Sequence, residues 1–510
     1  MTCQLTMILS LLIWIPVVGA LILGLYPGQV NAAQARQGAI ATFIGLVIAT
    51  GVAIFQFDPT QAGWQLVESV EWLPDLGLGY RLGVDGLSFP LLVLNTLLVG
   101  VAIFSTKPDI QRPRFYYTLM LLLSAGVAGA FVAKDVLLFF LFYELELIPL
   151  YFLIAIWGGE RRGYAATKFL IYTALSGILV LAAFLGLAAN TGFASFSYDT
   201  LQQFTAGQGG DAIAAGSQLI LLVLILVGFG IKTPLVPLHT WLPDAHVQAS
   251  TPISVLLAGV LLKLGTYGIL RFGLQLFPAA WNQISPILAL WATISVLYGA
   301  FAAISQAIAL ADMKKMVAYS SVGHMGFILL AAAAATPESL MGAECQMIAH
   351  GLISGLLFLL VGIIYKKTGT RELSVLGGLF NPERGLPLIG ILMIMGVMAS
   401  SGIPGMAGFV AEFLIFQGSF SVFPIYTLVS MLGTGLTAVY FLILINRTFL
   451  GRLGGRTDNL PAVTWSERTP AIALAIPIVL FGLLPQWLVL WSDSSTSALA
   501  TLFEGLSLGV

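Results

Sequence analysis

Two lysines of this sequence lie in apolar stretches, away from any loop. Lys232 follows the apolar run that begins at Gln218, and Lys263 lies near the middle of the apolar range 252–272. A lysine in a hydrocarbon-spanning segment is costly and normally faces a polar cavity lined by protein. We therefore predict that both lysines line an ion pathway. For Lys263 the competing interpretation is a side chain that snorkels to a membrane face.

Helix-breaking residues follow Lys232 directly. Pro234 and Pro237 interrupt the segment, and His239 and His246 come next, on either side of a short WLPDA motif. Proline inside a helix removes a backbone hydrogen bond and breaks the helix. Discontinuous helices are the usual way in which transporters build sites near the membrane midplane. The two histidines suit either proton shuttling or loop hydrogen bonds.

A carboxylate in another apolar stretch is the expected partner of Lys232. Glu144 lies within 135–157, with Pro149 shortly after it. A buried Glu–Lys pair exists either as an ion pair or as two neutral groups, so nearby charge decides where the proton resides, as a relay requires. A purely structural ion pair is the alternative. Glu146 points roughly 200° away on a regular helix, so we assign it either to another interface or to a position near the helix end.

The second half of the chain offers a matching set of ionisable residues. His324 and His350 each lie inside an apolar run, and Glu412 follows a second helix-breaking motif at 400–405. Ionisable residues within membrane segments are functional by default. Histidines that only fill packing positions remain the competing interpretation.

The composition is that of a polytopic membrane protein. Of 510 residues, 58% are hydrophobic and 9% are charged, whereas a soluble domain has about 25% charged residues. Cys3 and Cys345 are too far apart to indicate a disulfide framework, and the four histidines are too scattered for a metal site. No dinucleotide fingerprint, P-loop, CxxC motif or nucleic-acid surface is present. We therefore expect no metal and no bound cofactor in this chain.

Fourteen apolar stretches are long enough to span a bilayer, which takes about 20 residues. The first has no preceding Lys or Arg, so we predict an uncleaved helix rather than a signal peptide. The twelfth is too long for one straight helix and is predicted to break at 400–405. The stretches are 6–26, 38–57, 84–104, 115–133, 135–157, 168–190, 217–238, 252–272, 284–306, 315–335, 341–364, 386–420, 424–449 and 470–491.

The distribution of Lys and Arg supports this helix count. Seventeen of the 22 cations fall beside loops that follow odd-numbered helices, whereas Arg81, Lys134 and Arg271 fall on the other side. Lys232 and Lys263 are the remaining two. The positive-inside rule then places both termini on the non-cytoplasmic side.

The two broken helices are five apart in the helix order. Helices four to eight and nine to thirteen are therefore predicted to be equivalent units, the second inverted relative to the first, as in many transporters. This divides the all-α chain into N-terminal helices (1–113), a first five-helix repeat (114–275), a second repeat (280–450) and a C-terminal loop and helix (451–510).

Three motifs carry a resemblance to a known family. GIKTPLVPLHTWLPDAH, MKKMVAYSSVGHMGF and GIPGMAGFVAEF resemble the antiporter-like, proton-pumping subunits of respiratory complex I and of Mrp cation/proton antiporters. The segment ELELIPLYFLIAIWGGERRGYAATKFLIYTALSG is similar to the subunit 4 (NdhD) branch of photosynthetic complex I, an NAD(P)H-plastoquinone oxidoreductase. The resemblance extends from the first helix to the thirteenth and implies fourteen helices with broken helices seven and twelve.

The resemblance also implies roles for individual residues. Glu144, Lys232, Lys263 and Glu412 match the ionisable residues of helices five, seven, eight and twelve, and a further pair, His324 and His350, matches histidines of the central axis. By resemblance, these six residues form a proton relay driven by electron transfer in other subunits. Plastoquinone and Fe–S clusters are expected in those partners.

The expected partners are other antiporter-like and small hydrophobic membrane-arm subunits, peripheral-arm subunits and, indirectly, ferredoxin. The expected location is a cyanobacterial thylakoid membrane, with lumenal termini. Ala411 replaces a glycine common in relatives, and Phe142-Tyr143 replaces a common tryptophan; the second change indicates a specialised isoform associated with CO2 uptake. An Mrp-type antiporter subunit and a scaffold that no longer pumps are the alternatives.

Overall fold

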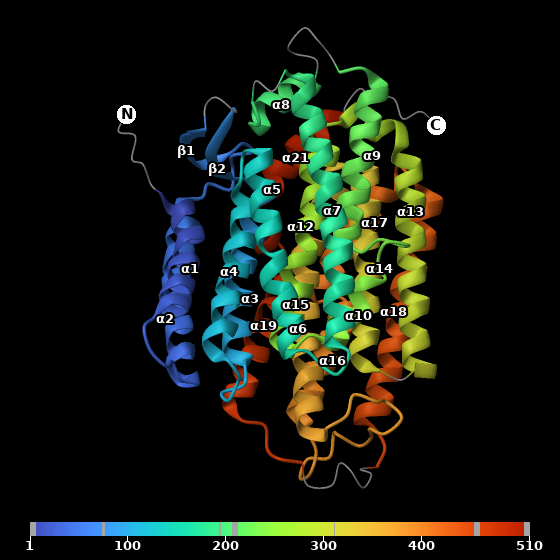
Figure 1. The fold of residues 1–510 in the computed structure, drawn as a ribbon. Coiled ribbons are helices and arrows are strands. Elements are labelled where there is room, and N and C mark those ends of the chain that lie inside the picture. The colour runs from blue at the N-terminus through green and yellow to red at the C-terminus, as the bar shows by residue number, and fades with distance from the viewer. Residues whose placement is uncertain are drawn as a thin grey trace.

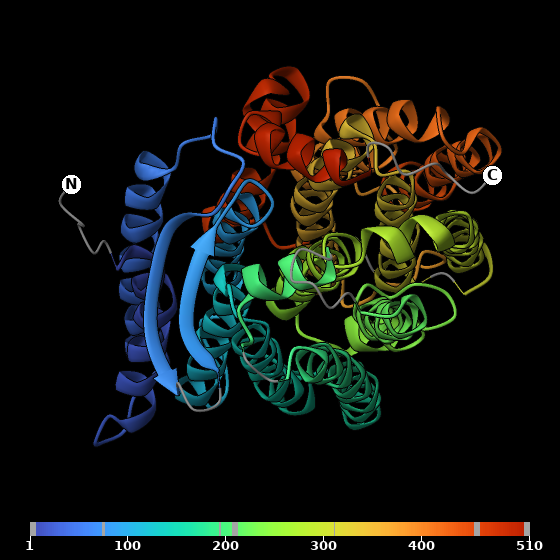
Figure 2. The same ribbon diagram turned by 90° about the horizontal axis from the view of Figure 1, so that it is seen from above.

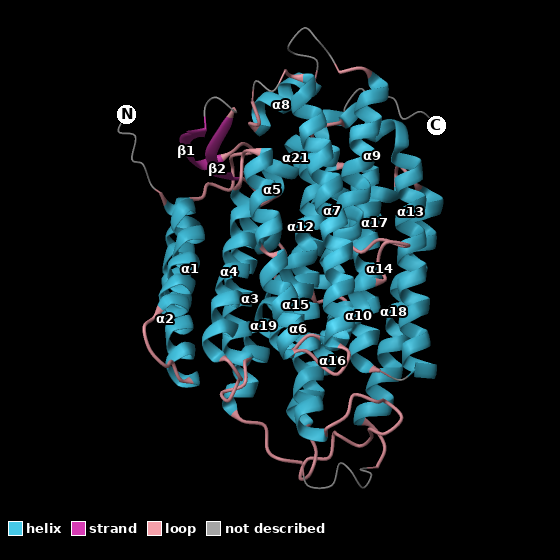
Figure 3. Cartoon of the chain, viewed as in Figure 1, coloured by secondary structure: helices cyan, strands magenta, loops and turns pink. Residues whose placement is uncertain are grey.

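The computed structural model describes residues 7–73, 77–192, 195–206, 213–310, 312–452 and 460–503, and these residues are almost entirely helical (Figures 1 and 3). Cys3, and Arg456 among the seventeen cations, lie outside them. In the described part, twelve helices are long and apolar enough to cross a membrane, and three shorter apolar helices accompany them. The prediction of an all-α polytopic membrane protein is confirmed.

The N-terminal part packs as a flank on one side of the molecule (Figure 2). Its elements are α1 (Ile8–Leu25), α2 (Ala32–Gln56), β1 (Gln65–Leu73), β2 (Leu78–Val84) and α3 (Phe89–Ser105). The antiparallel hairpin β1–β2 was not expected in the loop between the second and third predicted helices. Its Glu68 carboxylate is buried and accepts the N–H of Leu9 at 2.7 Å, so it caps the start of α1 and ties the hairpin to that helix.

The first predicted repeat occupies the middle of the chain. Its elements are α4 (Pro113–Val132), α5 (Val136–Leu145), α6 (Leu147–Trp157), α7 (Arg162–Asn190), α8 (Tyr198–Thr205), α9 (Ala215–Lys232), α10 (Trp241–Gln248), α11 (Thr251–Leu256), the π-helical η2 (Leu257–Leu261), α12 (Leu262–Gly268) and the π-helical η3 (Ile269–Leu274). Asp135 caps α5 and accepts the N–H groups of Leu137 and Leu138 at 3.1 and 3.2 Å.

The second predicted repeat and the C-terminus complete the bundle. Their elements are α13 (Pro278–Ser305), η4 (Gln306–Leu310), α14 (Met313–Ala334), α15 (Pro337–Thr368), α16 (Pro387–Ser400), α17 (Ala407–Phe420), α18 (Pro424–Phe449), α19 (Trp465–Leu483), α20 (Gln486–Val489), α21 (Asp493–Ala500) and η5 (Thr501–Phe503). Helices thus occupy all fourteen predicted ranges.

Both predicted helix breaks are present. The seventh helix divides into α9 and α10 around residues 233–240, and the twelfth divides into α16 and α17 around 401–406. Gly402 and Gly405 have φ values of 63° and 89° in the second break, a conformation that favours glycine. The inverted relationship between the two five-helix units stays a prediction.

The fifth helix contains a third, unexpected interruption. α5 ends at Leu145 and α6 begins at Leu147, with Glu146 between them in a turn. Pro149 explains this position, because it lacks the N–H that would bond to the Leu145 carbonyl, and its ring crowds that oxygen.

Three helices form the centre of the molecule. The most apolar 18 residues of the segment 251–274 are completely buried. The corresponding 18 residues of α14 and of α15 are 94% buried, whereas those of α2 are 28% buried. The peripheral helices therefore present apolar side chains outward, as lipid-facing helices do. Water does not reach the ionisable residues of the central helices, so other protein groups must supply their hydrogen bonds and opposite charges.

Candidate functional site

Lys232 forms a buried ion pair, but its partner is Glu146. The lysine ends α9, and its ammonium group contacts the Glu146 carboxylate; both side chains are almost inaccessible. The ammonium group also lies 4.9 Å from the ring centre of Tyr143. The C-terminal end of a helix favours a cation, so α9 itself supports the charge at this position. The prediction that Glu144 is the direct partner of Lys232 is wrong.

The face of α5 and α6 that meets α9 explains the pairing. Phe139 and Tyr143 both pack against Phe229 of α9, with ring centres 6.0 and 5.7 Å apart. Glu146 follows on the same face, in an i, i+4, i+7 series whose members are all buried. This buried stripe is visible only in the structure, because residues 136–142 are all apolar and the sequence does not single out one face.

Glu144 lies within electrostatic range of Lys232, but its carboxylate is directed at α7. Its carboxylate contacts the α carbon region of Gly177 in α7, where any larger residue would collide with it. Glu144 and Lys232 still interact electrostatically. The lysine therefore has one carboxylate in direct contact and a second within electrostatic range.

Lys263 and His350 are in direct contact at the centre of the bundle. Lys263 Nζ lies 2.7 Å from His350 Nδ1 and donates to the Ala258 carbonyl at 2.6 Å. Both side chains are buried, which excludes the snorkelling interpretation of Lys263. Ala258 belongs to η2, and π-helical turns recur at functional sites.

The contacts continue from His350 to Glu412. The rings of His350 and His324 are 5.4 Å apart between centres, and His324 Nδ1 lies 3.8 Å from Glu412 Oε1. Ser400, at the end of α16, lies 3.0 Å from His324 Nε2, and Thr434 of α18 donates to Glu412 Oε2 at 2.8 Å. Four of the six predicted residues therefore form one continuous series, which we call the buried axis: Lys263, His350, His324 and Glu412.

A small polar contact lies between the ion pair and the buried axis. Gly265, two residues after Lys263, packs against the hydroxyl and backbone of Thr233, which directly follows Lys232. The Thr233 hydroxyl is buried and has no hydrogen-bond partner among the described residues. The two helices approach each other here because Gly265 has no side chain. The two groups of charges are therefore separated here by one close contact between helices.

Two further ionisable residues approach the buried axis from the other side. His246 is buried, stacks on Phe358 with ring centres 4.3 Å apart, and has no hydrogen-bond partner for either ring nitrogen among the described residues. It interacts electrostatically with both Lys263 and Lys314. Lys314 was counted as a loop cation, but it is buried and donates to the Ala249 carbonyl at 2.6 Å. His239 is also buried and packs on Tyr298.

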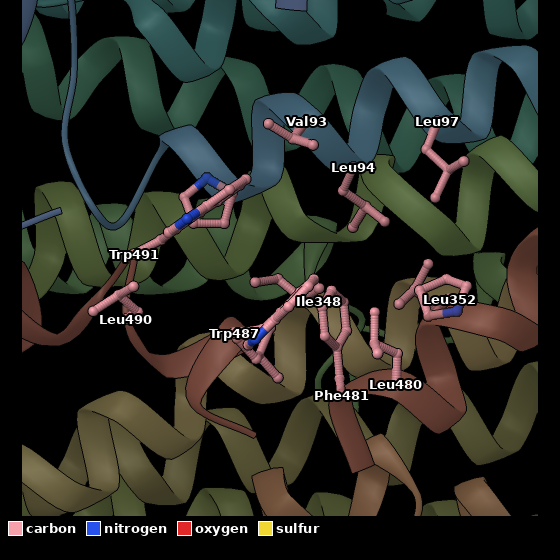
Figure 4. A pocket seen from close by; sticks show the side chains of 13 residues that line it. Val93, Leu94, Leu97, Ile348, Leu352, Leu480, Phe481, Trp487, Leu490 and Trp491 are labelled. Atoms are coloured by element: carbon pink, nitrogen blue, oxygen red, sulfur yellow. The ribbon is translucent and has the colours of Figure 1, made fainter. Parts of the chain in front are cut away.

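The arrangement suits proton transfer and charge coupling rather than ligand binding. A cavity of about 400 Å³ between α3, α15 and α19 is lined by apolar and tryptophan side chains, among them Leu94, Ile348, Phe481 and Trp487 (Figure 4). None of its lining residues is ionisable. The charged groups are instead buried among packed helices, where low dielectric strengthens every electrostatic interaction.

Comparison with known proteins gives the same picture. Residues 133–437 match the family model described as NADH:quinone oxidoreductase/Mrp antiporter, TM. The chain is 38% identical over 492 residues to NAD(P)H-quinone oxidoreductase chain 4 of Prochlorococcus marinus (strain NATL2A), covering 94% of this chain and 89% of that protein. It is 40% identical over 452 residues to chain 4 3 of Picosynechococcus sp. (strain PCC 7002), covering 87% and 80%.

Solved structures share the fold over the whole chain. A chain of respiratory complex I from Thermus thermophilus superposes with a TM-score of 0.86 at 28% identity, covering 98% of this chain and all of that chain. A chain of the Mrp complex from Dietzia sp. superposes with a TM-score of 0.85 at 21% identity, and both chains are fully covered. At 21% identity, the likeness to the chain of the Mrp complex is one of fold alone.

Proposed function

The chain belongs to the NADH:quinone oxidoreductase/Mrp antiporter family of membrane proteins, and we propose that it is a proton-translocating membrane-arm subunit of a NAD(P)H-quinone oxidoreductase. The observation that carries this proposal is the buried axis from Lys263 to Glu412, together with the adjacent Lys232–Glu146 pair. Relatives 38–40% identical are named as chain 4 of that enzyme, which favours it over a cation antiporter.

The ion pair acts as the input of the relay. Electron transfer in partner subunits changes the charge near this chain, and Lys232 moves between a closed pair with Glu146 and an open state. Two unit charges 4 Å apart interact by about 4 kcal/mol at an effective dielectric near 20. Opening one pair is therefore enough to change the proton affinity of a neighbouring group by about three orders of magnitude, at 1.4 kcal/mol per tenfold.

The buried axis acts as the conductor. Lys263 passes a proton to His350, the ring of His350 passes it toward His324, and Glu412 receives it next. Each transfer is between groups that lie in contact or close to it. Glu144, which interacts with Lys232 without bonding to it, is the second site that Lys232 approaches when the pair with Glu146 opens.

The remaining assignments follow the cyanobacterial relatives. The chain lies in a thylakoid membrane with its termini in the lumen, and protons move from the cytoplasm to the lumen. It contains no redox cofactor; plastoquinone and Fe–S clusters belong to partner subunits, and ferredoxin or NAD(P)H supplies the electrons to the complex. Membership of a CO2-uptake form of the complex is a further part of this proposal.

The test is Lys232→Met in the intact complex, with Lys107→Met as the matched control in an exposed loop. Proton uptake by membrane vesicles and quinone reduction are measured on the same preparation, after assembly has been checked. We expect Lys232→Met to lower the number of protons moved per electron, whereas Lys107→Met leaves it unchanged. An unchanged ratio in an assembled Lys232→Met complex contradicts the relay. Co-purification with only antiporter subunits would favour the Mrp-type function.

A further inference from the structure

Glu344 is a buried carboxylate that the relay described above does not use. It lies near the start of α15, is completely inaccessible, and neither of its oxygens has a hydrogen-bond partner among the described residues. Burying a carboxylate without partners is costly, so such a group in a folded protein requires an explanation.

The nearest cation is already engaged by another acid. Arg271 Nη2 donates to both oxygens of Asp85 at 2.6 Å, and its other nitrogens donate to Tyr267 and Gln275 at 3.2 and 2.8 Å. The guanidinium group also lies 4.4 Å from the ring centre of Trp64. Glu344 interacts electrostatically with both Arg271 and Asp85 but bonds to neither of them. It is therefore an additional acid beside a completed pair.

Glu344 lies between that pair and the buried axis. It precedes His350 on α15 by six residues, which is about 9 Å along the helix. His350 Nδ1 contacts Lys263, but His350 Nε2 is buried and has no partner among the described residues. Between the two levels, Thr266 of α12 contacts Met347 at 2.9 Å. Unpartnered polar atoms thus occur at two levels of the same helix, and one or two waters between them would complete a path.

The far end of this series reaches the hairpin end of the molecule. Asp85 directly follows β2, and Arg271 lies in η3 at the end of the central helix, so both are at the end that carries β1, β2 and α8 (Figure 1). The predicted topology puts this end on the non-cytoplasmic side. The neighbouring apolar cavity, whose wall includes Ile348, does not supply the path, because apolar cavities stay dry (Figure 4).

We propose that Glu344 is a proton-carrying site on a branch that leaves the buried axis at His350 and runs to the hairpin end beside Asp85 and Arg271. In the transfer step an N–H bond at His350 Nε2 breaks and an O–H bond at Glu344 forms, with water carrying the proton between them. Glu344 then releases the proton toward the hairpin end, and Asp85 keeps Arg271 from holding Glu344 permanently as an anion. This branch rests on the proposed function, since it takes its protons from the same axis.

Glu344→Gln in the intact complex tests the branch, because glutamine keeps the size of the side chain but carries no proton. Glu338→Gln is the matched control, an exposed acid in the first turn of the same helix. The readouts are protons moved per electron in vesicles and the carboxylic C=O bands in redox-induced infrared difference spectra. We expect Glu344→Gln to lower the ratio and to lose one C=O band, and Glu338→Gln to change neither.

Other outcomes separate this inference from the proposed function. If Lys232→Met lowers the ratio and Glu344→Gln changes neither readout, the relay stands and the branch is wrong. If Glu344→Gln does not assemble, Glu344→Asp keeps the carboxyl group, and the branch predicts a shifted C=O band; an unshifted spectrum overturns it. A lowered ratio without loss of a band also contradicts the proposal, since it would make Glu344 a structural charge only.

Discussion

The two broken helices hold their ionisable residues in different ways. In the seventh helix, Lys232 is the last residue of α9, where the helix end favours a cation, and it meets Glu146 in a direct ion pair. In the twelfth helix, Glu412 lies five residues past the start of α17 and meets no cation in direct contact. The Thr434 hydroxyl donates a hydrogen bond to it, and His324 Nδ1 lies 3.8 Å from its other oxygen. The second nitrogen of His324 contacts the Ser400 hydroxyl.

This difference shows that a helix break creates room for an ionisable group without deciding its charge state. The first break contains an ion pair, which suits the input role proposed for it. The second contains an acid and a histidine that hydrogen-bond to hydroxyl groups, which suits the proton-carrying role proposed for it. The predicted equivalence of the two five-helix units therefore does not imply equal roles.

Glu146→Gln has the largest expected effect in this comparison. Removing one partner of a buried ion pair leaves the other charge uncompensated, which costs about 3–5 kcal/mol. We expect a strong loss of assembled complex and of its thermal stability. Glu144→Gln, measured beside it, should cost less, because Glu144 does not bond to Lys232.

The double variant Glu146→Gln with Lys232→Met is the control for this prediction. It removes both charges together, so it should recover much of the lost assembly while proton transport stays impaired. If Glu144→Gln destabilises the complex more than Glu146→Gln does, the pairing described for the first break is incorrect.

Thr434→Val tests the second break with a smaller expected effect. The substitution removes the hydroxyl that donates to Glu412 at 2.8 Å, and such a hydrogen bond contributes about 1 kcal/mol, or up to about 3 kcal/mol when the acceptor is charged. Thr427→Val is the matched control, since that hydroxyl, on the same helix, bonds only the Phe423 carbonyl. Thermal unfolding of the purified complex measures both. Equal losses in the two variants would show that Thr434 does not support Glu412.

Ser400→Ala has the smallest expected effect. It removes the partner of His324 Nε2 at 3.0 Å, and a typical hydrogen bond contributes about 1 kcal/mol. Ser401→Ala, at the next residue, removes a buried hydroxyl that has no partner in the described part of the chain. We expect the first variant to lower thermal stability and slow proton uptake, and the second to change neither. A larger loss for Ser401→Ala than for Ser400→Ala would show that the contact between His324 and Ser400 does not support the second break.

The sequence by itself determined the helices, the two predicted breaks and the position of Lys232 and Lys263 away from any loop. These features follow from local causes, because a spanning helix needs a long apolar run and a proline or glycine cluster interrupts it wherever it occurs. An apolar run also predicts that a lysine within it is buried, even when the partner of that lysine is unknown. Apolar surroundings also singled out His324, His350 and Glu412, which the structure brings together with Lys263.

Only the tertiary structure decided which charges meet. Glu144 and Glu146 are two residues apart, and the choice between them depends on which face of α5 packs against α9, which no local pattern fixes until the neighbour is known. The Asp85–Arg271 pair joins residues 186 positions apart, and the isolation of Glu344 exists only because that pair is complete. Buried charge is a property of contacts between helices, and chain order does not state those contacts.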